Sequence, residues 1–157
     1  MGFDQFALSE DKDVRLTLQK NGEPLTLTET PEVFRMENSS VCYEFGKKQG
    51  SFLKLEKNGK ACITAPVEWN VYRAPTDNDR NIVLSWKEAG YDRSVVKVYG
   101  CEARVKQGTV AITCDFSMAA VYIQPFLRLH AVWSINGEGE IKVAVDGKRD
   151  TSFPGSA

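Results

Sequence analysis

Short runs of alternating apolar and polar residues, bounded by Gly, Asn and Pro, constrain the fold of this chain more than any other feature. Residues 41–45 and 52–56 are clear examples. Alternation with a period of two puts every second side chain on one face of a β-strand, so each run predicts a half-buried strand. Further runs follow at 95–99, 102–106, 110–116, 126–135 and 140–146. We predict a mainly β fold, an antiparallel β-sandwich whose second half is a meander.

Two local signals refine this prediction. Asn58-Gly59 lies between two of the runs, and because both residue types tolerate positive φ, the pair predicts a type I′ hairpin turn. Residues 82–90 instead place apolar side chains at helical spacing and end on Gly90, the usual residue after a helix C-terminus. We therefore expect one short helix, with Asn81 or Asp79 capping its start.

The N-terminal region, residues 1–32, does not continue the regular series of alternating runs. Residues 3–8 alternate like a lone strand, which would need a partner sheet to bury its aromatic face. Residues 24–31, with a proline at each end and threonines between, indicate an extended connector. We therefore predict a domain boundary near Glu32, with a strand of a preceding domain plus a linker in residues 1–32 and the β domain in residues 33–157.

Composition places the chain among ordinary globular domains. Its 157 residues suffice for one hydrophobic core, and 42% are hydrophobic while 26% are charged. Basic and acidic residues number 20 and 21 and form no long run of one sign. This balance argues against nucleic acid and membrane surfaces as partners.

The four cysteines form no CxxC pair, and only His130 could add an imidazole, which argues against a structural zinc site. We expect four buried free thiols, as in a cytoplasmic protein. The first residues lack the basic and apolar pattern of a signal peptide, but a domain cut from a longer protein loses its own N-terminus, so this observation does not decide the location.

One loop concentrates polar side chains that could carry chemistry. Pro75 fixes its own φ and biases Ala74 toward extended geometry, so the residues that follow should emerge in a reproducible place. We single out a structural motif that consists of Arg73, Pro75, Asp77, Asn78 and Asp79.

Several interpretations of this loop compete. Glycoside hydrolysis by Asp77 and Asp79 would need one carboxyl kept protonated, whereas Arg73 and Arg80 favour the ionised forms. A structural role needs no such conditions: the Asp side chains would accept backbone N–H bonds while one of the two arginines pairs with a carboxylate. Contact with a neighbouring domain or the edge of a ligand site is a further alternative.

Calcium binding at the same loop also has a partial signal. Asp77, Asp79, Asn81 and Glu88 fall at positions 1, 3, 5 and 12 of an EF-hand-like register. Position six is Ile82 where the sharp turn requires glycine, and the following residues favour a helix. We therefore predict no metal site.

Other candidate sites have weaker support. His130 could anchor a catalytic triad only with a nucleophile from elsewhere, and no nucleophile-elbow or glycine-rich phosphate motif is present. Trp69, Tyr72 and Trp133 are possible carbohydrate contacts, because aromatic rings stack on sugars. Their alternating positions favour packing in the core instead.

Residues 72–79, followed by 86–91, closely resemble the opening of the C-terminal domain of family 2 glycoside hydrolase β-galactosidases. The family pattern is Trp/Tyr-Arg-Ala-Pro-x-Asp-Asn-Asp, then Trp-Lys-x-Ala-Gly-aromatic. Residues 50–53 resemble the glycine-aromatic hairpin before that motif, and residues 2–6 resemble the last strand of the preceding immunoglobulin-like domain. The resemblance covers nearly the whole chain.

The resemblance implies a part of a β-supersandwich of the galactose-mutarotase type, with the catalytic glutamates in a separate TIM barrel. We therefore expect no catalytic residue and no cofactor here, and a non-catalytic structural segment of a larger enzyme that hydrolyses terminal β-galactosides. Its partners would be the remaining domains of the parent enzyme, and the galactoside would be a substrate of that enzyme. Any requirement for Mg²⁺ or Na⁺ would also belong to the parent enzyme.

Two alternative functions stay open, an independent carbohydrate-binding module and a protein-interaction β domain. Residues 155–157 depart from the Leu-Pro-Arg-type strand with which the family continues, so we expect an incompletely closed sandwich. An exposed sheet edge would then favour self-association into a homo-oligomer.

Overall fold

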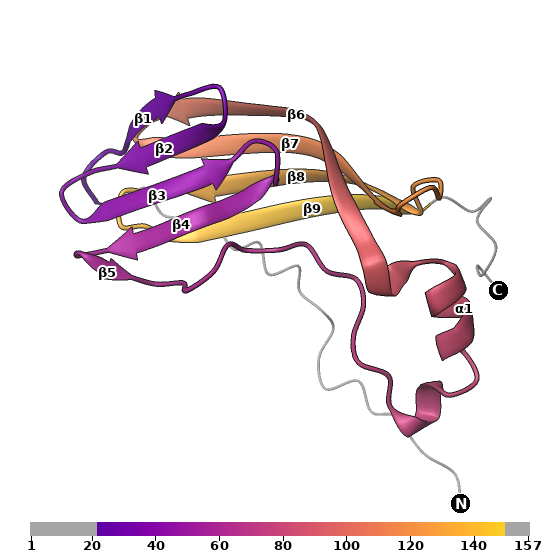
Figure 1. Ribbon diagram of the computed structural model, residues 1–157. Coiled ribbons are helices and arrows are strands. Elements are labelled where there is room, and N and C mark those ends of the chain that lie inside the picture. Colours follow the sequence, from indigo (N-terminus) through magenta and orange to yellow (C-terminus); the bar gives the residue numbers. More distant parts are fainter. Residues whose placement is uncertain (1–21, 150–157) are drawn as a thin grey trace, which may run out of the picture.

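The computed structural model describes residues 22–149 and consists of two antiparallel sheets that face each other (Figure 1). The first sheet has the order β1 (Thr26–Glu29), β2 (Val33–Glu37), β3 (Val41–Gly46), β4 (Ser51–Lys57) and β5 (Lys60–Ala61). The second has the order β6 (Ser94–Lys106), β7 (Thr109–Ala120), β8 (Leu127–Ile135) and β9 (Ile141–Arg149). The predicted antiparallel sandwich and meander are confirmed.

The segment between the sheets carries the helical elements, which extend beyond the end of the sandwich (Figure 1). They are the 3₁₀ turn η1 (Asp77–Asp79), the helix α1 (Val83–Glu88) and the 3₁₀ turn η2 (Tyr91–Arg93). Gly90, with φ of 76°, follows the helix in the left-handed region, as predicted. Asn58 and Gly59 have φ of 52° and 72°, which confirms the type I′ turn between β4 and β5.

Two predicted strands prove to be one. Residues 95–99 and 102–106 both belong to β6, whose pairing with β7 shifts register between Val98 and Gly100. This shift is a β-bulge, which absorbs an extra residue without ending the strand. In the sequence, alternation breaks at Gly100, and this break was interpreted as a turn between two strands.

The connector predicted for residues 24–31 is also corrected. Residues 26–29 form β1, which pairs with β2, and Leu25 is only 4% exposed in the core. Pro24 and Pro31 bracket an edge strand instead of interrupting it, which is where proline is tolerated in a sheet. The boundary near Glu32 stays a prediction, and the strand predicted at residues 3–8 lies outside the described residues.

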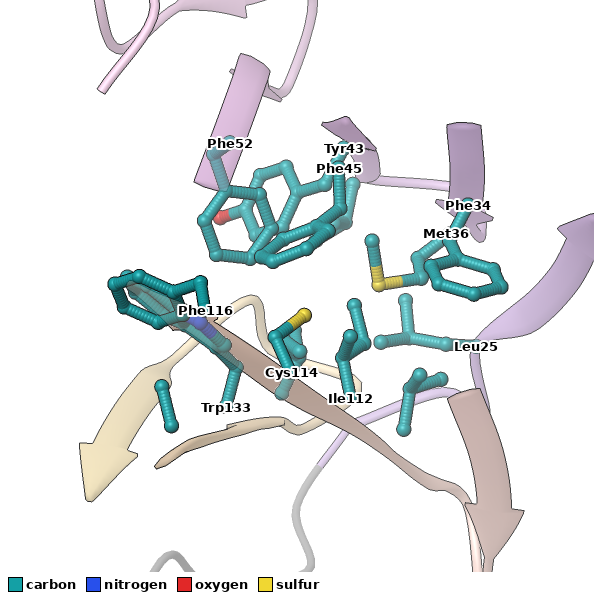
Figure 2. Close-up of a cluster of buried hydrophobic side chains, with 14 residues drawn as sticks. Leu25, Phe34, Met36, Tyr43, Phe45, Phe52, Ile112, Cys114, Phe116 and Trp133 are labelled. Carbon is teal, nitrogen blue, oxygen red and sulfur yellow. The ribbon is translucent and has the colours of Figure 1, made fainter. Parts of the chain in front are cut away.

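The core fills the space between the two sheets (Figure 2). Phe52 is its aromatic centre: its ring centroid lies 5.2 Å from that of Phe45 and 5.4 Å from that of Trp133, both edge-to-face. Phe116 and Ile112 of β7 close the other side and are at most 1% exposed. In β3, β7 and β8 the buried residues sit at alternate positions, as the period-two pattern predicted. Phe52 is an exception, because the register of β4 shifts beside Leu53 and brings Phe52 to the core face.

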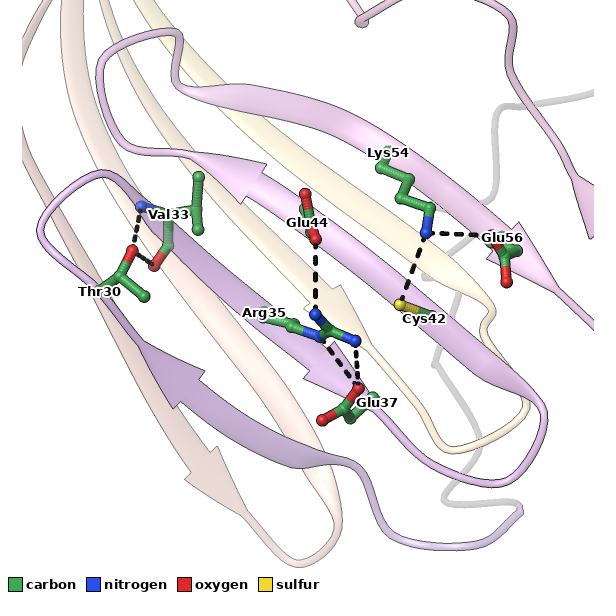
Figure 3. A network of polar contacts seen from close by, with 8 residues as sticks. All are labelled: Thr30, Val33, Arg35, Glu37, Cys42, Glu44, Lys54 and Glu56. Carbon is green, nitrogen blue, oxygen red and sulfur yellow. Dashed lines mark hydrogen bonds and ion pairs between the residues drawn. The ribbon is translucent and has the colours of Figure 1, made fainter. Parts of the chain in front are cut away.

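The outer face of the first sheet is a charged, solvated surface (Figure 3). Arg35 lies 2.9 Å from Glu37 and 3.9 Å from Glu44, and Lys54 lies 3.0 Å from Glu56. Exposed pairs of this kind contribute little to stability. Their role is to keep this face of the sheet in water.

The cysteines differ from the prediction. Cys101 and Cys114 lie opposite each other on β6 and β7 and form a disulfide, while Cys42 and Cys62 have free thiols. Directly opposed residues of antiparallel strands come within disulfide reach. The bulge turns Cys101 toward the core side of β6, and the sequence alone did not reveal that register. The cytoplasmic location therefore loses one of its supports and stays a prediction.

Among residues 22–149, no helix has the length and apolar character needed to cross a membrane.

Candidate functional site

The loop between the sheets is built around a buried carboxylate. Asp79 is 8% exposed, and Arg73 binds it with both guanidinium nitrogens, at 2.6 and 2.8 Å. The backbone N–H and the hydroxyl of Thr76 donate to the same Oδ2, at 2.8 and 2.9 Å. The predicted pairing of an arginine with a loop carboxylate is confirmed, and the arginine is Arg73.

These donors fix the protonation state of Asp79. The Arg73 hydrogen bonds and then the Thr76 backbone N–H lower the pKa of the Asp79 carboxyl to about 2, although partial burial opposes them. The same contact raises the pKa of Arg73. A carboxyl group that stays ionised and holds several donors cannot supply a proton to a leaving group, so it is unsuited to general acid catalysis.

The predicted helix cap is wrong. The residue before α1 is Ile82, whose side chain makes no capping bond, and Asp79 contributes only its backbone oxygen, which accepts the Ile82 N–H at 2.9 Å. The Asp79 carboxylate accepts hydrogen bonds from Arg73 and Thr76 instead, so it does not cap α1. Thr76 was not among the predicted site residues, although Thr76 and Asp79 match the [Ser/Thr]-x-x-[Asp/Glu] spacing of a capping box, a signal that predicts this pair.

The Asp79 contacts make the stability of the fold depend on pH. Because the pKa is about 2 in the folded chain and 3.8 ordinarily, the unfolded chain takes up the proton more readily. The ionised carboxylate therefore stabilises the fold above pH 4, and this contribution is lost as pH falls toward 2. We expect Asp79→Asn to flatten the fall of the melting temperature between pH 4 and 2, measured by circular dichroism.

The same variant at pH 7 should melt roughly 5 °C below the wild type, because a paired acceptor is lost. Asp77→Asn is the matched control, since Asp77 is an exposed carboxyl of the same turn. It should keep the wild-type dependence on pH. An Asp79→Asn profile that coincides with that of the wild type would contradict the role assigned to this carboxylate.

Aromatic side chains surround the loop. The Arg73 guanidinium lies 5.4 Å from the centre of the Trp86 ring, and the Tyr72 ring meets Trp86 edge-on with centroids 6.4 Å apart. With Tyr91, these side chains line an open hollow of about 470 Å³. The arginine therefore ties the loop to helix α1 as well as to Asp79.

The possible carbohydrate contacts occupy different environments. Trp133 is 8% exposed in the sandwich core, so its ring is not available to a sugar, and the structure does not support that role. Trp69 is half-buried, packs on Phe116 and donates its indole N–H to the Gly50 carbonyl at 3.0 Å. Tyr72 lines the hollow beside Arg73. A carbohydrate contact by Trp69 or Tyr72 stays a prediction.

The remaining candidates do not join the loop. His130 lies on β8, where its Nδ1 is 2.7 Å from Asp115 of β7. Over the described range 22–149, no group of three or more His, Cys, Asp or Glu side chains is placed to hold a metal ion.

Comparison with known proteins gives the family of this chain. The family model described as the β-galactosidase small chain matches residues 37–155. The chain belongs to the β-galactosidase small-chain family. In this chain, the Arg73–Asp79 loop lies within the segment that crosses from the first sheet to the second, which Figure 1 shows between β5 and β6.

Curated relatives support the assignment over nearly the whole chain. A β-galactosidase of Actinobacillus pleuropneumoniae is 32% identical over 159 residues, which cover 98% of this chain and 15% of the relative. A β-galactosidase of Staphylococcus xylosus is 26% identical and covers 96% of this chain and 16% of the relative. This chain of the β-galactosidase small-chain family thus spans about 15% of the length of the relatives it matches.

Proposed function

We propose that this chain is a non-catalytic structural segment of an enzyme that hydrolyses terminal β-D-galactosides. One observation carries the proposal: the most distinctive carboxylate of the sequence, Asp79, is held ionised by Arg73 and Thr76. Retaining glycoside hydrolysis needs one carboxyl group that is protonated before bond cleavage and a second that attacks the sugar. Asp79 serves instead as the anchor of a loop.

The geometry of the loop supports a bracing role. Arg73 joins Asp79 on one side and Trp86 on the other, so a single side chain connects the turn η1 to helix α1. The hollow lined by Tyr72 and Tyr91 opens beside it. We propose that this surface contacts the remaining domains of the parent enzyme, and that the parent supplies the galactoside site and any requirement for Mg²⁺ or Na⁺.

An activity assay tests the proposal. We expect the purified chain to release nitrophenol from nitrophenyl β-D-galactoside no faster than buffer does, because Asp79, the buried carboxyl of the loop, stays ionised and cannot act as the general acid. A full-length β-galactosidase at the same molar concentration is the positive control. Turnover that follows the concentration of the chain and is lost in Asp79→Asn would overturn the proposal.

The edge strand β9 supports the second proposal, that the isolated chain self-associates. Val143 and Val145 are 43% and 42% exposed on the side of β9 that faces the core, so the sandwich leaves this edge partly uncovered. Exposed apolar edge strands pair with other strands. We expect sedimentation to show a mass that rises with concentration, and a smaller rise in Val145→Lys. A concentration-independent monomer would refute self-association.

A further inference from the structure

A groove of about 400 Å³ crosses the outer face of the second sheet, away from the Arg73–Asp79 loop. Phe116, Leu129 and Gly147 of β7, β8 and β9 line it and are partners in register. The side chains of Phe116 and Leu129 belong to the core, and Gly147 has none. These three residues therefore offer mainly backbone to the outside, and they form a shallow floor between the side chains on either side.

The two walls of the groove come from the residues that flank this floor. Asp115, His130 and Asp146 are partners in register and form one wall. Arg128 and Lys148, also partners, form the other. Residues two apart in a strand are separated by roughly 7 Å, which sets the width of the groove.

Tyr99 completes the basic wall. It sits at the β6 bulge, and its hydroxyl is 2.9 Å from that of Ser117, the residue of β7 paired with Arg128. Bulges turn individual side chains out of the regular alternation and are common beside functional sites. The ring is 53% exposed, so it lies over the sheet and still presents apolar surface to the groove.

Two polar side chains of the groove are held by hydrogen bonds to neighbouring strands. His130 is held by Asp115 at 2.7 Å, and Tyr99 is held by Ser117. The Ser117 hydrogen bond lowers the pKa of the Tyr99 hydroxyl, burial opposes it, and the positive charges of Arg128 and Lys97 lower the pKa further. Side chains fixed in this way lose little conformational entropy when a ligand binds.

The charges of the two walls cancel. Asp115 and Asp146 are balanced by Arg128 and Lys148, so neither a simple anion nor a simple cation is favoured by the net charge. Carboxylates accept hydrogen bonds and guanidinium and ammonium groups donate them, so a ligand that both donates and accepts along its two edges fits best. A sugar hydroxyl does both, and a pyranose ring also has an apolar C–H face for the Tyr99 ring.

The size of the groove excludes bulkier partners. An α-helix with side chains is about 10–12 Å wide, which exceeds the space between the walls. A peptide could not pair with β7 or β8 within the groove, because each of these strands already has a neighbour on both sides. We propose that this groove is a saccharide-binding site for a neutral pyranose, with hydroxyls bound by Asp146 and Arg128 and the ring against Tyr99.

This inference is independent of the bracing role proposed above, and nuclear magnetic resonance can test it directly. D-galactose and lactose are titrated into the ¹⁵N-labelled full chain. We expect saturable amide shifts at residues 115–117, 128–130 and 146–148, with a Kd on the order of 1–10 mM, as for a small polar ligand.

Variants separate the groove from nonspecific effects. Asp146→Asn keeps the shape of the side chain and should weaken binding at least fivefold, and Arg128→Ala should weaken it at least tenfold. Arg104→Ala is the matched control, because Arg104 is an 82% exposed arginine of the same sheet outside the groove. It should leave the Kd within twofold. The dispersion of the spectra shows whether each variant is folded.

Two outcomes would overturn the proposal. One is the absence of saturable shifts with both sugars up to 50 mM, on the order of ten times the expected Kd. The other is a set of shifts that map to Trp69 and Tyr72 and leave the groove unchanged. In the first outcome, shifts at the groove with phosphate or methylammonium would identify its ligand as an ion and not as a saccharide.

Discussion

Trp133→Ala should lower the free energy of unfolding by about 3–5 kcal/mol, the range for truncation of a buried tryptophan. The Trp133 ring meets Phe45, Phe52 and Trp69 with centroids 5.8, 5.4 and 5.7 Å apart, so its removal leaves a cavity among three aromatic rings from the first half of the chain. Those rings cannot all move inward, because each is fixed by its own strand or loop. Urea unfolding followed by circular dichroism measures the loss.

Trp133→Phe separates packing from hydrogen bonding at the same position. Among the described residues, the Trp133 indole nitrogen is the buried side-chain polar atom without a hydrogen-bond partner. Phenylalanine therefore removes an unsatisfied donor while it keeps most of the ring, and we expect a loss of about 1 kcal/mol or less. A loss as large as that of alanine would show that the indole makes a contact that the packing argument omits.

The sequence predicted the local elements well because their signals are local. The Asn58-Gly59 turn requires only two adjacent residues that tolerate positive φ, and both have it. Helix α1 ends where Gly90 makes continuation unfavourable. The alternating run of β3 also predicted its buried face, since period-two burial follows from strand geometry alone. In β4, a shift of register beside Leu53 brings both Phe52 and Leu55 to the core side, which alternation did not predict.

Features that depend on register could not be predicted in this way. The disulfide joins Cys101 to Cys114 only because the bulge at Tyr99 shifts the second half of β6 by one residue. From the sequence, Leu25 was assigned to a linker, because the pairing of the next residues with β2 could not be predicted. The groove on the second sheet is the clearest case: Asp115, His130 and Asp146 are far apart in sequence and adjacent only in the paired strands.

The candidate loop lies between these cases. Arg73 and Asp79 are six residues apart, so their pairing could be proposed from sequence, and the structure confirms it. The proposed helix cap failed because one carboxylate cannot serve two sets of donors at different positions. Thr76 and Arg73 bind Asp79 first, and the start of α1 is left with the Asp79 backbone oxygen.

Gly90→Ala should lower the free energy of unfolding by about 2–5 kcal/mol, more than the same change at Gly59, which should cost about 1–2 kcal/mol. Both glycines have positive φ, 76° and 72°, so the backbone strain of an added side chain is similar. They differ in their surroundings. A Cβ at Gly90 would lie 2.3 Å from the Ala120 Cβ, whereas one at Gly59 would meet no atom within 4 Å.

The additional loss of unfolding free energy in Gly90→Ala over Gly59→Ala therefore measures how tightly the helical segment packs against β7. To relieve the clash, Gly90 and the end of α1 must move away from Ala120, and this movement also displaces Trp86 from Arg73. We expect the acid-dependent stability that Asp79 provides to shrink in Gly90→Ala and to be unchanged in Gly59→Ala.

A compensating change tests this mechanism. Ala120 is 3% exposed, and Ala120→Gly removes the atom that the new Cβ would meet. The double variant Gly90→Ala/Ala120→Gly should recover the clash energy and retain the strain of positive φ, so its free energy of unfolding should exceed that expected from adding the two single losses. Strictly additive losses would mean that Gly90 is required for its backbone conformation alone, and that contact with β7 does not position the helix beside the Arg73–Asp79 loop.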